Sequence, residues 1–301
     1  MKVYFDNVDL SSSSGPNSFA GKLTKYMVKD NHEPTSDLST SDARLCFIES
    51  HIPKNDIPLI QRLDGIYFNL SQNYKQQNQN IEKTYHQSDG VVFQTEFNKQ
   101  LTTKYFGGHQ NSVVIPNGAD NELIDQILPL AHKKIDKYEN IWSCASHWRP
   151  HKRLDDNIEY FLQHAGQHDC LLVAGKLDKQ YKKDSKILYL GELDHKRLIS
   201  VYKSSRHFIH LAWLDHCPNV VIDARASGCQ IICASAGGTK EIAGLDGIII
   251  EEDDWDFNPV ELYKPPELNF KNKIKNSFNS DYNMLHVMRK YIDFIHSNIL
   301  E

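Results

Sequence analysis

The chain has 301 residues, 40% of them hydrophobic and 24% charged, with a formal net charge of −5 and a pI near 6.3. This length predicts two domains of roughly 150 residues each, and the acidic balance argues against a broad nucleic-acid or anionic-membrane surface. The six cysteines and fifteen histidines are scattered along the sequence without the spacing of a zinc site or a disulfide framework, so we expect neither.

The chain opens on a short strand over residues 2–5, a polar loop over 9–17 and a helix over 18–28. Gly15 lies in that loop, and a glycine turn between a strand and a helix lets the backbone approach a ligand closely. A solvent-exposed loop is an equally good interpretation. Because the sequence turns polar at Asp6, too early for the apolar core of a signal peptide, we expect a cytoplasmic protein.

The next charged turn contains Arg62 and Asp64, beside Gly65. Asp64 could contact a sugar or an acceptor hydroxyl, or it could form an ion pair with Arg62 that closes the loop. Around this turn the sequence predicts the following elements: an irregular segment over 30–43, strands over 45–49, 90–97 and 112–120, and helices over 73–86, 97–105 and 121–139.

The second half alternates strands and helices, which predicts a parallel, doubly wound sheet. The expected strands cover 141–145, 170–175, 187–193, 207–214, 229–234 and 247–251. The loop after the first of these strands carries Arg149, Lys152 and Arg153, and this concentration of cations suits a diphosphate.

Asp215 follows the apolar strand 207–214 and therefore lies at its carboxyl end, where ligands of open α/β sheets bind. Pro218 suits the first position of a helix, so Asn219 and Val220 would present backbone N–H groups and the positive end of the helix dipole to a phosphate. Asp223, eight residues after Asp215, could accept hydrogen bonds from sugar hydroxyls. The alternative is that the pair is a helix cap or loop acid and a solvated helix acid.

These residues resemble the donor site of retaining family 4 glycosyltransferases of the group 1 type, in which the two acids are glutamates in a Glu-x7-Glu pattern. The family also shows Gly-Arg-x4-Lys-Gly in the cationic loop. Lys152 aligns with the lysine, whereas His147 takes the place of the arginine and leaves that charge to Arg149 or Arg153.

The resemblance implies an α/β chain of the GT-B fold, with two Rossmann-like, doubly wound parallel-sheet domains facing a cleft. The expected parts are an abbreviated acceptor-side domain over 1–138, a nucleotide-sugar-binding domain over 139–280 and a C-terminal helix over 281–301 that braces the first domain. The apolar stripe of that helix is also compatible with a homodimer contact.

The activity implied is metal-independent transfer of a sugar, with retention, from a UDP- or GDP-linked donor to an acceptor hydroxyl, without a cofactor. Lys152, Arg149 and Asp215 would be the catalytic residues. The donor-binding residues would be Gly15, Asp64, His147, Gly191, Pro218, Asn219, Val220 and Asp223. Two alternatives remain open, a GT-B sugar-nucleotide epimerase and a non-catalytic sugar-nucleotide or glycan-binding protein derived from a transferase.

Overall fold

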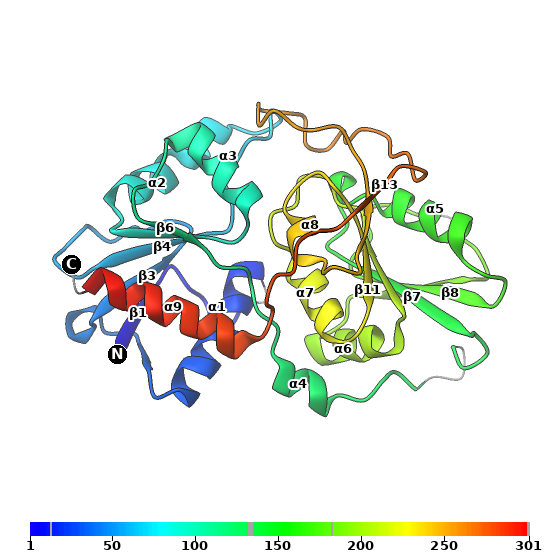
Figure 1. The fold of residues 1–301 in the computed structure, drawn as a ribbon, viewed down its shortest axis with the longest axis horizontal. Helices are drawn as coiled ribbons and strands as arrows, with labels where there is room; N and C mark the ends of the chain where they lie inside the picture. Colours follow the sequence, from blue (N-terminus) through cyan, green and yellow to red (C-terminus); the bar gives the residue numbers. More distant parts are fainter. Residues whose placement is uncertain (13, 132–134, 182, 300–301) are drawn as a thin grey trace. The chain divides into compact units, whose positions relative to one another are not determined.

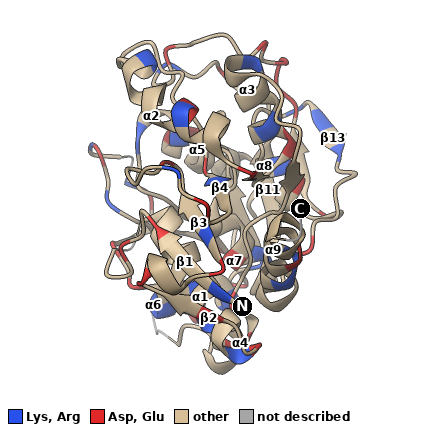
Figure 2. Cartoon of the chain, turned by 90° about the vertical axis from the view of Figure 1, so that its left-hand side faces the viewer, with Lys and Arg blue, Asp and Glu red and all other residues tan. Residues whose placement is uncertain are grey.

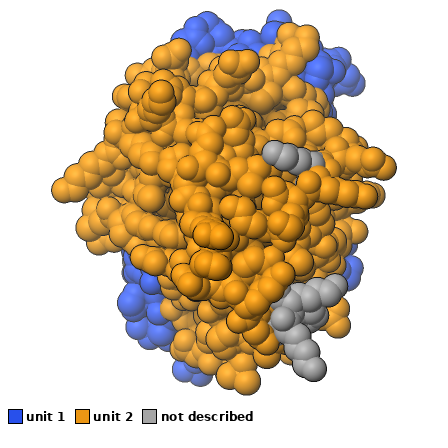
Figure 3. All heavy atoms as spheres, turned by 90° about the vertical axis from the view of Figure 1, so that its right-hand side faces the viewer, with its two compact units in different colours: residues 1–119, 256–260, 281–301 blue, residues 120–255, 261–280 orange. Residues whose placement is uncertain are grey.

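The computed structural model describes residues 1–12, 14–131, 135–181 and 183–299, and the chain divides into two compact units (Figures 1 and 3). Unit 1 comprises Met1–Ala119, Asp256–Val260 and Asp281–Glu301, and unit 2 comprises Asp120–Trp255 and Glu261–Ser280. The chain therefore leaves unit 1 and returns to it twice. Among the described residues, no helix combines the length and the apolar character needed to cross a bilayer.

Unit 1 is built on a six-stranded, wholly parallel sheet in the order β2-β1-β3-β4-β5-β6. Its strands are β1 (Lys2–Asp6), β2 (Glu33–Thr35), β3 (Ala43–Phe47), β4 (Leu59–Leu63), β5 (Gly90–Phe93) and β6 (Ser112–Val114). Its helices are α1 (Gly15–Lys29), the 3-10 turn η1 (Leu38–Thr40), α2 (Tyr74–Gln87), α3 (Glu96–Phe106) and α9 (Met284–Ile299). Because every strand runs in the same direction, all six carboxyl ends lie at one edge of this sheet.

Helix α9, the last helix described, lies beside α1 and completes the core of unit 1 (Figure 1). Apolar residues recur every three or four positions along it, which is the spacing of one helix face. The buried residues of this stripe are Met284, Val287, Met288, Tyr291, Ile292 and Ile295, and they pack with residues of α1 and of the sheet.

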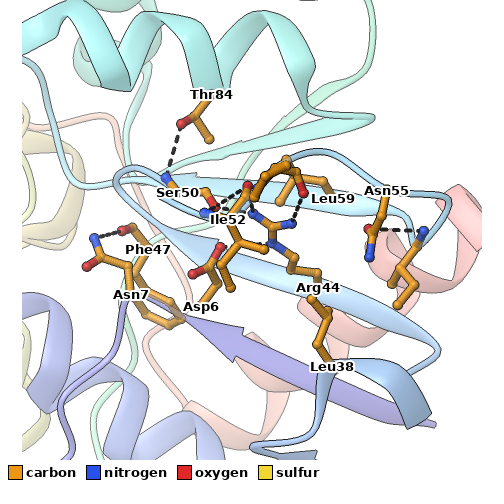
Figure 4. Close-up of polar contacts among 12 residues, drawn as sticks. Asp6, Asn7, Leu38, Arg44, Phe47, Ser50, Ile52, Asn55, Leu59 and Thr84 are labelled. Atoms are coloured by element: carbon orange, nitrogen blue, oxygen red, sulfur yellow. Dashed lines mark hydrogen bonds and ion pairs between the residues drawn. The ribbon is translucent and has the colours of Figure 1, made fainter.

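A fully buried arginine, Arg44 on β3, organises the loop between β3 and β4 (Figure 4). Its Nε donates to Asp6 Oδ2 at 2.8 Å, and its terminal nitrogens donate to the carbonyl oxygens of Pro53 (3.2 Å) and Ile52 (2.8 Å) and to Ser50 Oγ. A buried charge is tolerated only when it is paired and hydrogen-bonded, and this guanidinium meets both conditions.

Unit 2 is built on a seven-stranded sheet in the order β13-β12-β11-β10-β7-β8-β9, in which only β13 is antiparallel to its neighbour. Its strands are β7 (Asn140–Ala145), β8 (Asp169–Ala174), β9 (Ile187–Gly191), β10 (His207–His210), β11 (Gln230–Ala234), β12 (Ile248–Ile250) and β13 (Lys273–Lys275). Its helices are α4 (Asn121–Gln126), the 3-10 turn η2 (Pro150–Lys152), α5 (Leu154–His164), α6 (His195–Ser204), α7 (Asn219–Ala226) and α8 (Thr239–Ile242). The expected α/β architecture with two parallel-dominated sheets is confirmed.

The strand order of unit 2 reverses direction at β7. From β7 the chain moves outward through β8 to the edge strand β9, then crosses back to β10 on the other side of β7. Such a reversal leaves a crevice beyond the carboxyl ends of the two central strands, since the connections from those strands lead away in opposite directions.

Some elements differ from those expected from sequence. The helix expected over 121–139 ends at Gln126, because Pro129 follows closely and disfavours helical backbone before it; Lys133 and Lys134 lie outside the described residues. Helix α7 begins at Asn219, so Pro218 caps the helix and is not its first residue. Basic and acidic residues are interspersed in the view of Figure 2.

Candidate functional site

The point where the unit 2 sheet reverses direction is bordered by two loops, residues 146–153 after β7 and residues 211–218 after β10. These strands are hydrogen-bonded neighbours, so their loops begin side by side. The two loops meet through their charged side chains, since Lys152 Nζ lies 2.5 Å from Asp215 Oδ2. Two residues singled out by sequence, 63 positions apart, are thus in direct contact at the place where this topology positions a ligand.

Asp215 has a second partner that the sequence did not reveal. His210, the last residue of β10, places its Nε2 2.9 Å from the same Oδ2, and the His216 N–H donates to Oδ1 at 3.2 Å. The His210 side chain is 3% exposed, against 16% for Asp215 and 18% for Lys152. The Asp215 carboxylate therefore contacts a buried imidazole on one side and, nearer the surface, the Lys152 ammonium.

The ionisation of this cluster follows from its surroundings. Burial would raise the pKa of Asp215, but the charge of Lys152 and the hydrogen bond from His210 outweigh burial and hold that pKa well below its usual range. Burial lowers the pKa of His210 even though Asp215 opposes the shift. At neutral pH, Asp215 is an anion, and the neutral His210 ring donates its Nε2–H to it.

Close backbone approaches hold both loops in place. Gly237 has φ +101°, and a Cβ there would lie 2.7 Å from the Asp215 carbonyl oxygen, which accepts a hydrogen bond from the Gly238 N–H at 2.8 Å. Gly175 has φ +108°, and a Cβ there would lie 1.8 Å from the Ser146 carbonyl oxygen. Leu214, immediately before Asp215, adopts φ +54°, a left-handed conformation that is uncommon for a bulky residue.

The cations of the loop after β7 differ in their availability. Arg153 is buried, and its guanidinium donates to Glu252 Oε1 at 2.7 Å and to the carbonyl oxygens of Pro266 (2.7 Å) and Leu211 (3.3 Å). Its charge is therefore engaged in holding the loop. Arg149 and His147 are exposed, so Lys152 and Arg149 are the cations of this loop that remain accessible.

The start of α7 contributes the positive end of an eight-residue helix, with Pro218 as cap and Asn219 and Val220 in the first turn. Asp223, one turn further along, is only 4% exposed, and its Oδ2 lies 3.0 Å from Nε2 of His195 at the start of α6. The two acids that sequence placed in one pattern are thus both bound by histidines.

The remaining expected site residues belong to other elements of the two units. Gly191 is the exposed last residue of β9, with φ +69°. In unit 1, Gly15 is the first residue of α1, and Asp64 follows β4. Asp64 Oδ1 accepts hydrogen bonds from the fully buried Arg62 and from Gln94, while burial raises the Asp64 pKa against the opposing charge of Arg62.

Comparison with known proteins supports the architecture. Residues 130–257 match the family model described as "Glycosyl transferases group 1". This range contains the loop after β7, the loop after β10 and α7. Among curated proteins, no sequence matches the chain.

Solved structures share the fold at low sequence identity. AviGT4, a glycosyltransferase involved in avilamycin A biosynthesis, is 12% identical with a TM-score of 0.63, covering 99% of this chain and 98% of that one. Sucrose-phosphate synthase from Thermosynechococcus elongatus is 12% identical with a TM-score of 0.63, covering 84% and 86%. Anabaena HepE, solved in complex with UDP-glucose, is 13% identical with a TM-score of 0.59, covering 99% and 93%.

Proposed function

The chain has the GT-B fold and carries a glycosyl transferases group 1 region in its second unit, and on this premise we propose that it transfers a sugar from a nucleotide-diphosphate sugar to an acceptor hydroxyl. The observation that carries the proposal is the contact between Lys152 and Asp215 at the reversal point of the unit 2 sheet. We further propose that transfer retains the anomeric configuration and needs no metal ion.

The leaving group sets the main requirement of this reaction. When the anomeric carbon–oxygen bond breaks, negative charge builds up on the departing nucleoside diphosphate, and preorganised positive groups lower the barrier if they bind that charge more strongly than the ground state. Lys152, the exposed Arg149 and the N-terminal end of α7 can supply such groups from unit 2. This supply of positive charge is our reason for proposing metal independence.

The carboxylate of Asp215 has two consequences for the donor. It positions the Lys152 ammonium, and Oδ1, which already accepts from the His216 N–H, can accept a further hydrogen bond from a hydroxyl of the donor sugar. Both interactions would orient the anomeric carbon. By resemblance to retaining enzymes of this fold, the acceptor oxygen forms its bond on the face that the diphosphate leaves, and the hydroxyl proton passes to a phosphate oxygen.

The first test is nucleotide binding. We expect UDP or GDP to raise the melting temperature of the purified protein in EDTA, since a ligand at 100 times its dissociation constant adds about 2.7 kcal/mol of stability. HepE was solved with UDP-glucose, which makes UDP the first nucleotide to try. ADP and CMP serve as comparisons, and no shift with any nucleotide would contradict the donor site.

The second test separates a transferase from a protein that only binds. Lys152→Ala should lower the rate of nucleoside diphosphate release from the preferred sugar nucleotide by about 10²-fold or more, because it removes a charge-stabilising contact. Lys179→Ala is the matched control, since Lys179 is an exposed lysine of the same unit that pairs with Asp155. Unchanged release in Lys152→Ala would contradict the mechanism. Nucleotide binding with no sugar release or transfer by the wild type would instead favour the non-catalytic alternative.

A further inference from the structure

His195, the first residue of α6, forms a polar pair with Asp223 in unit 2 that is separate from the Lys152–Asp215 contact. Its Nε2 lies 3.0 Å from Asp223 Oδ2. The two side chains differ strongly in exposure, 44% for His195 and 6% for Asp223. A buried carboxylate thus holds one edge of an imidazole that is partly exposed to solvent.

This arrangement fixes what the imidazole can offer a ligand. A carboxylate only accepts hydrogen bonds, so Nε2 must carry the proton that it donates to Asp223. In the neutral ring, Nδ1 then bears a lone pair and becomes an acceptor. The ligand group best suited to this acceptor is a hydroxyl, because a hydroxyl can donate a hydrogen bond and an ionised phosphate has no hydrogen to donate.

The location of the pair connects it to the proposed donor site. Helix α6 follows the carboxyl end of β9, α7 follows the carboxyl end of β10, and the two helices pack together. His195 at the start of α6 therefore lies at the same edge of the sheet as the first turn of α7 and Asp215. The Asp223 side chain is buried, so a ligand at this edge would meet the imidazole before the carboxylate.

We infer that His195 binds the nucleoside part of the donor by accepting a hydrogen bond from a ribose hydroxyl, with Asp223 acting as the positioning residue that orients the ring. This inference rests on the proposed function, since it requires a nucleoside diphosphate at the carboxyl edge of the unit 2 sheet. It assigns a ribose contact to the histidine that binds Asp223, the acid that the sequence analysis placed among the donor-binding residues.

The test compares ribonucleotides with deoxynucleotides. Dissociation constants of UDP, 2′-deoxy-UDP and 3′-deoxy-UDP, or of the GDP series if GDP is preferred, are measured by calorimetry for the wild type and for His195→Ala. The wild type should bind one deoxynucleotide roughly three- to tenfold more weakly than the ribonucleotide, the effect of one hydrogen bond. In His195→Ala this preference should disappear, because the ribonucleotide loses affinity and that deoxynucleotide does not.

Two further variants sharpen the result. His168→Ala, at an exposed histidine of the same unit, should retain the full preference. Asp223→Asn keeps the shape of the positioning side chain and should reduce the preference without abolishing nucleotide binding, which provides the comparison if His195→Ala folds poorly.

Several outcomes would overturn the inference. One is that His195→Ala weakens the binding of the ribonucleotide and of both deoxynucleotides by the same factor, as expected for a phosphate contact. Another is that it leaves all three affinities unchanged. A wild type that binds no nucleoside diphosphate would refute the proposed function and this inference together, whereas nucleotide binding without a ribose preference would refute the inference alone.

Discussion

Replacing Asp215 by Asn should lower the free energy of unfolding by about 3 kcal/mol. The substitution preserves the shape of the side chain but removes the ionised acceptor that receives Lys152 Nζ at 2.5 Å and His210 Nε2 at 2.9 Å. Hydrogen bonds to charged groups contribute about 1.5–3 kcal/mol each, and breaking a buried pair costs about 3–5 kcal/mol. Because Asp215 and Lys152 retain 16% and 18% exposure, we expect the lower end of the second range.

A second lysine–aspartate pair of the same unit provides the control for this magnitude. Lys179 Nζ lies 2.6 Å from Asp155 Oδ2, almost the same separation, but these side chains are 56% and 65% exposed. Exposed pairs of this kind contribute about 0–1 kcal/mol, since solvent screens the charges and two mobile side chains must be ordered. Asp155→Asn should therefore change the free energy of unfolding by less than about 1 kcal/mol.

The assay is thermal unfolding at pH 7 with a double-mutant cycle for each pair. For a domain of 150–250 residues, 1 kcal/mol corresponds to about 2–4 °C, so Asp215→Asn should lower the melting temperature by roughly 6–12 °C. Lys152→Met combined with Asp215→Asn should show a coupling energy above about 1 kcal/mol, and the Lys179–Asp155 cycle a coupling near zero. Equal effects at the two pairs would refute the argument that burial sets the strength of the interaction.

Two further predictions concern the loops around the site. Gly175→Ala should lower the free energy of unfolding by at least about 3 kcal/mol, because it combines a positive φ with a Cβ placed 1.8 Å from the Ser146 carbonyl oxygen. Gly21→Ala, in α1 with nothing within 4 Å of the added Cβ, should instead raise the free energy of unfolding by up to about 1 kcal/mol. Denaturant titration of both variants measures the difference, and similar midpoints would contradict the prediction. Burial lowers the pKa of His151 to about 3 and that of His216 to about 4, so the folded protein keeps both rings neutral below pH 6.5 while the unfolded chain takes up protons. Stability present above pH 6.5 should therefore fall as the pH drops toward 4, with a limiting slope of about 1.4 kcal/mol per pH unit per ring. His151→Phe should remove one such contribution from the melting profile, and an unchanged pH slope would show that His151 does not titrate in this way.

Hydrophobic patterning predicted the elements whose buried residues are apolar. The strands around 141–145 and 230–234 and the final helix follow this rule, and they lie where periodicity placed them. Strand β4 was not predicted from the sequence, because two of its five buried residues are Gln61 and Arg62, which a pattern of apolar residues cannot identify as core. Their burial depends on partners distant in sequence, such as Tyr291, whose hydroxyl accepts from Arg62 Nε at 3.1 Å.

The residues of the candidate site also fall into those that the sequence predicts and those that only the structure reveals. Asp215 and Lys152 could be found because each follows a predictable strand and the topology brings neighbouring strand ends together. The binding of Arg153 to Glu252 could not be anticipated, since the two residues are 99 positions apart and Arg153 stands in a cationic loop like its neighbours. His210 left one local signal, a polar residue closing an apolar strand, but only the structure shows that it supports Asp215.

The contribution of α9 to the core of unit 1 has a consequence for synthesis. Unit 2 is encoded entirely between residues 120 and 280, so all of its strands have been translated before α9 begins at Met284. Unit 1 contains the first residues of the chain but lacks the apolar stripe from Met284 to Ile295 until that segment has been translated. We therefore expect the N-terminal sheet to leave the ribosome with an uncovered apolar face and to become stable only after the unit that follows it has folded.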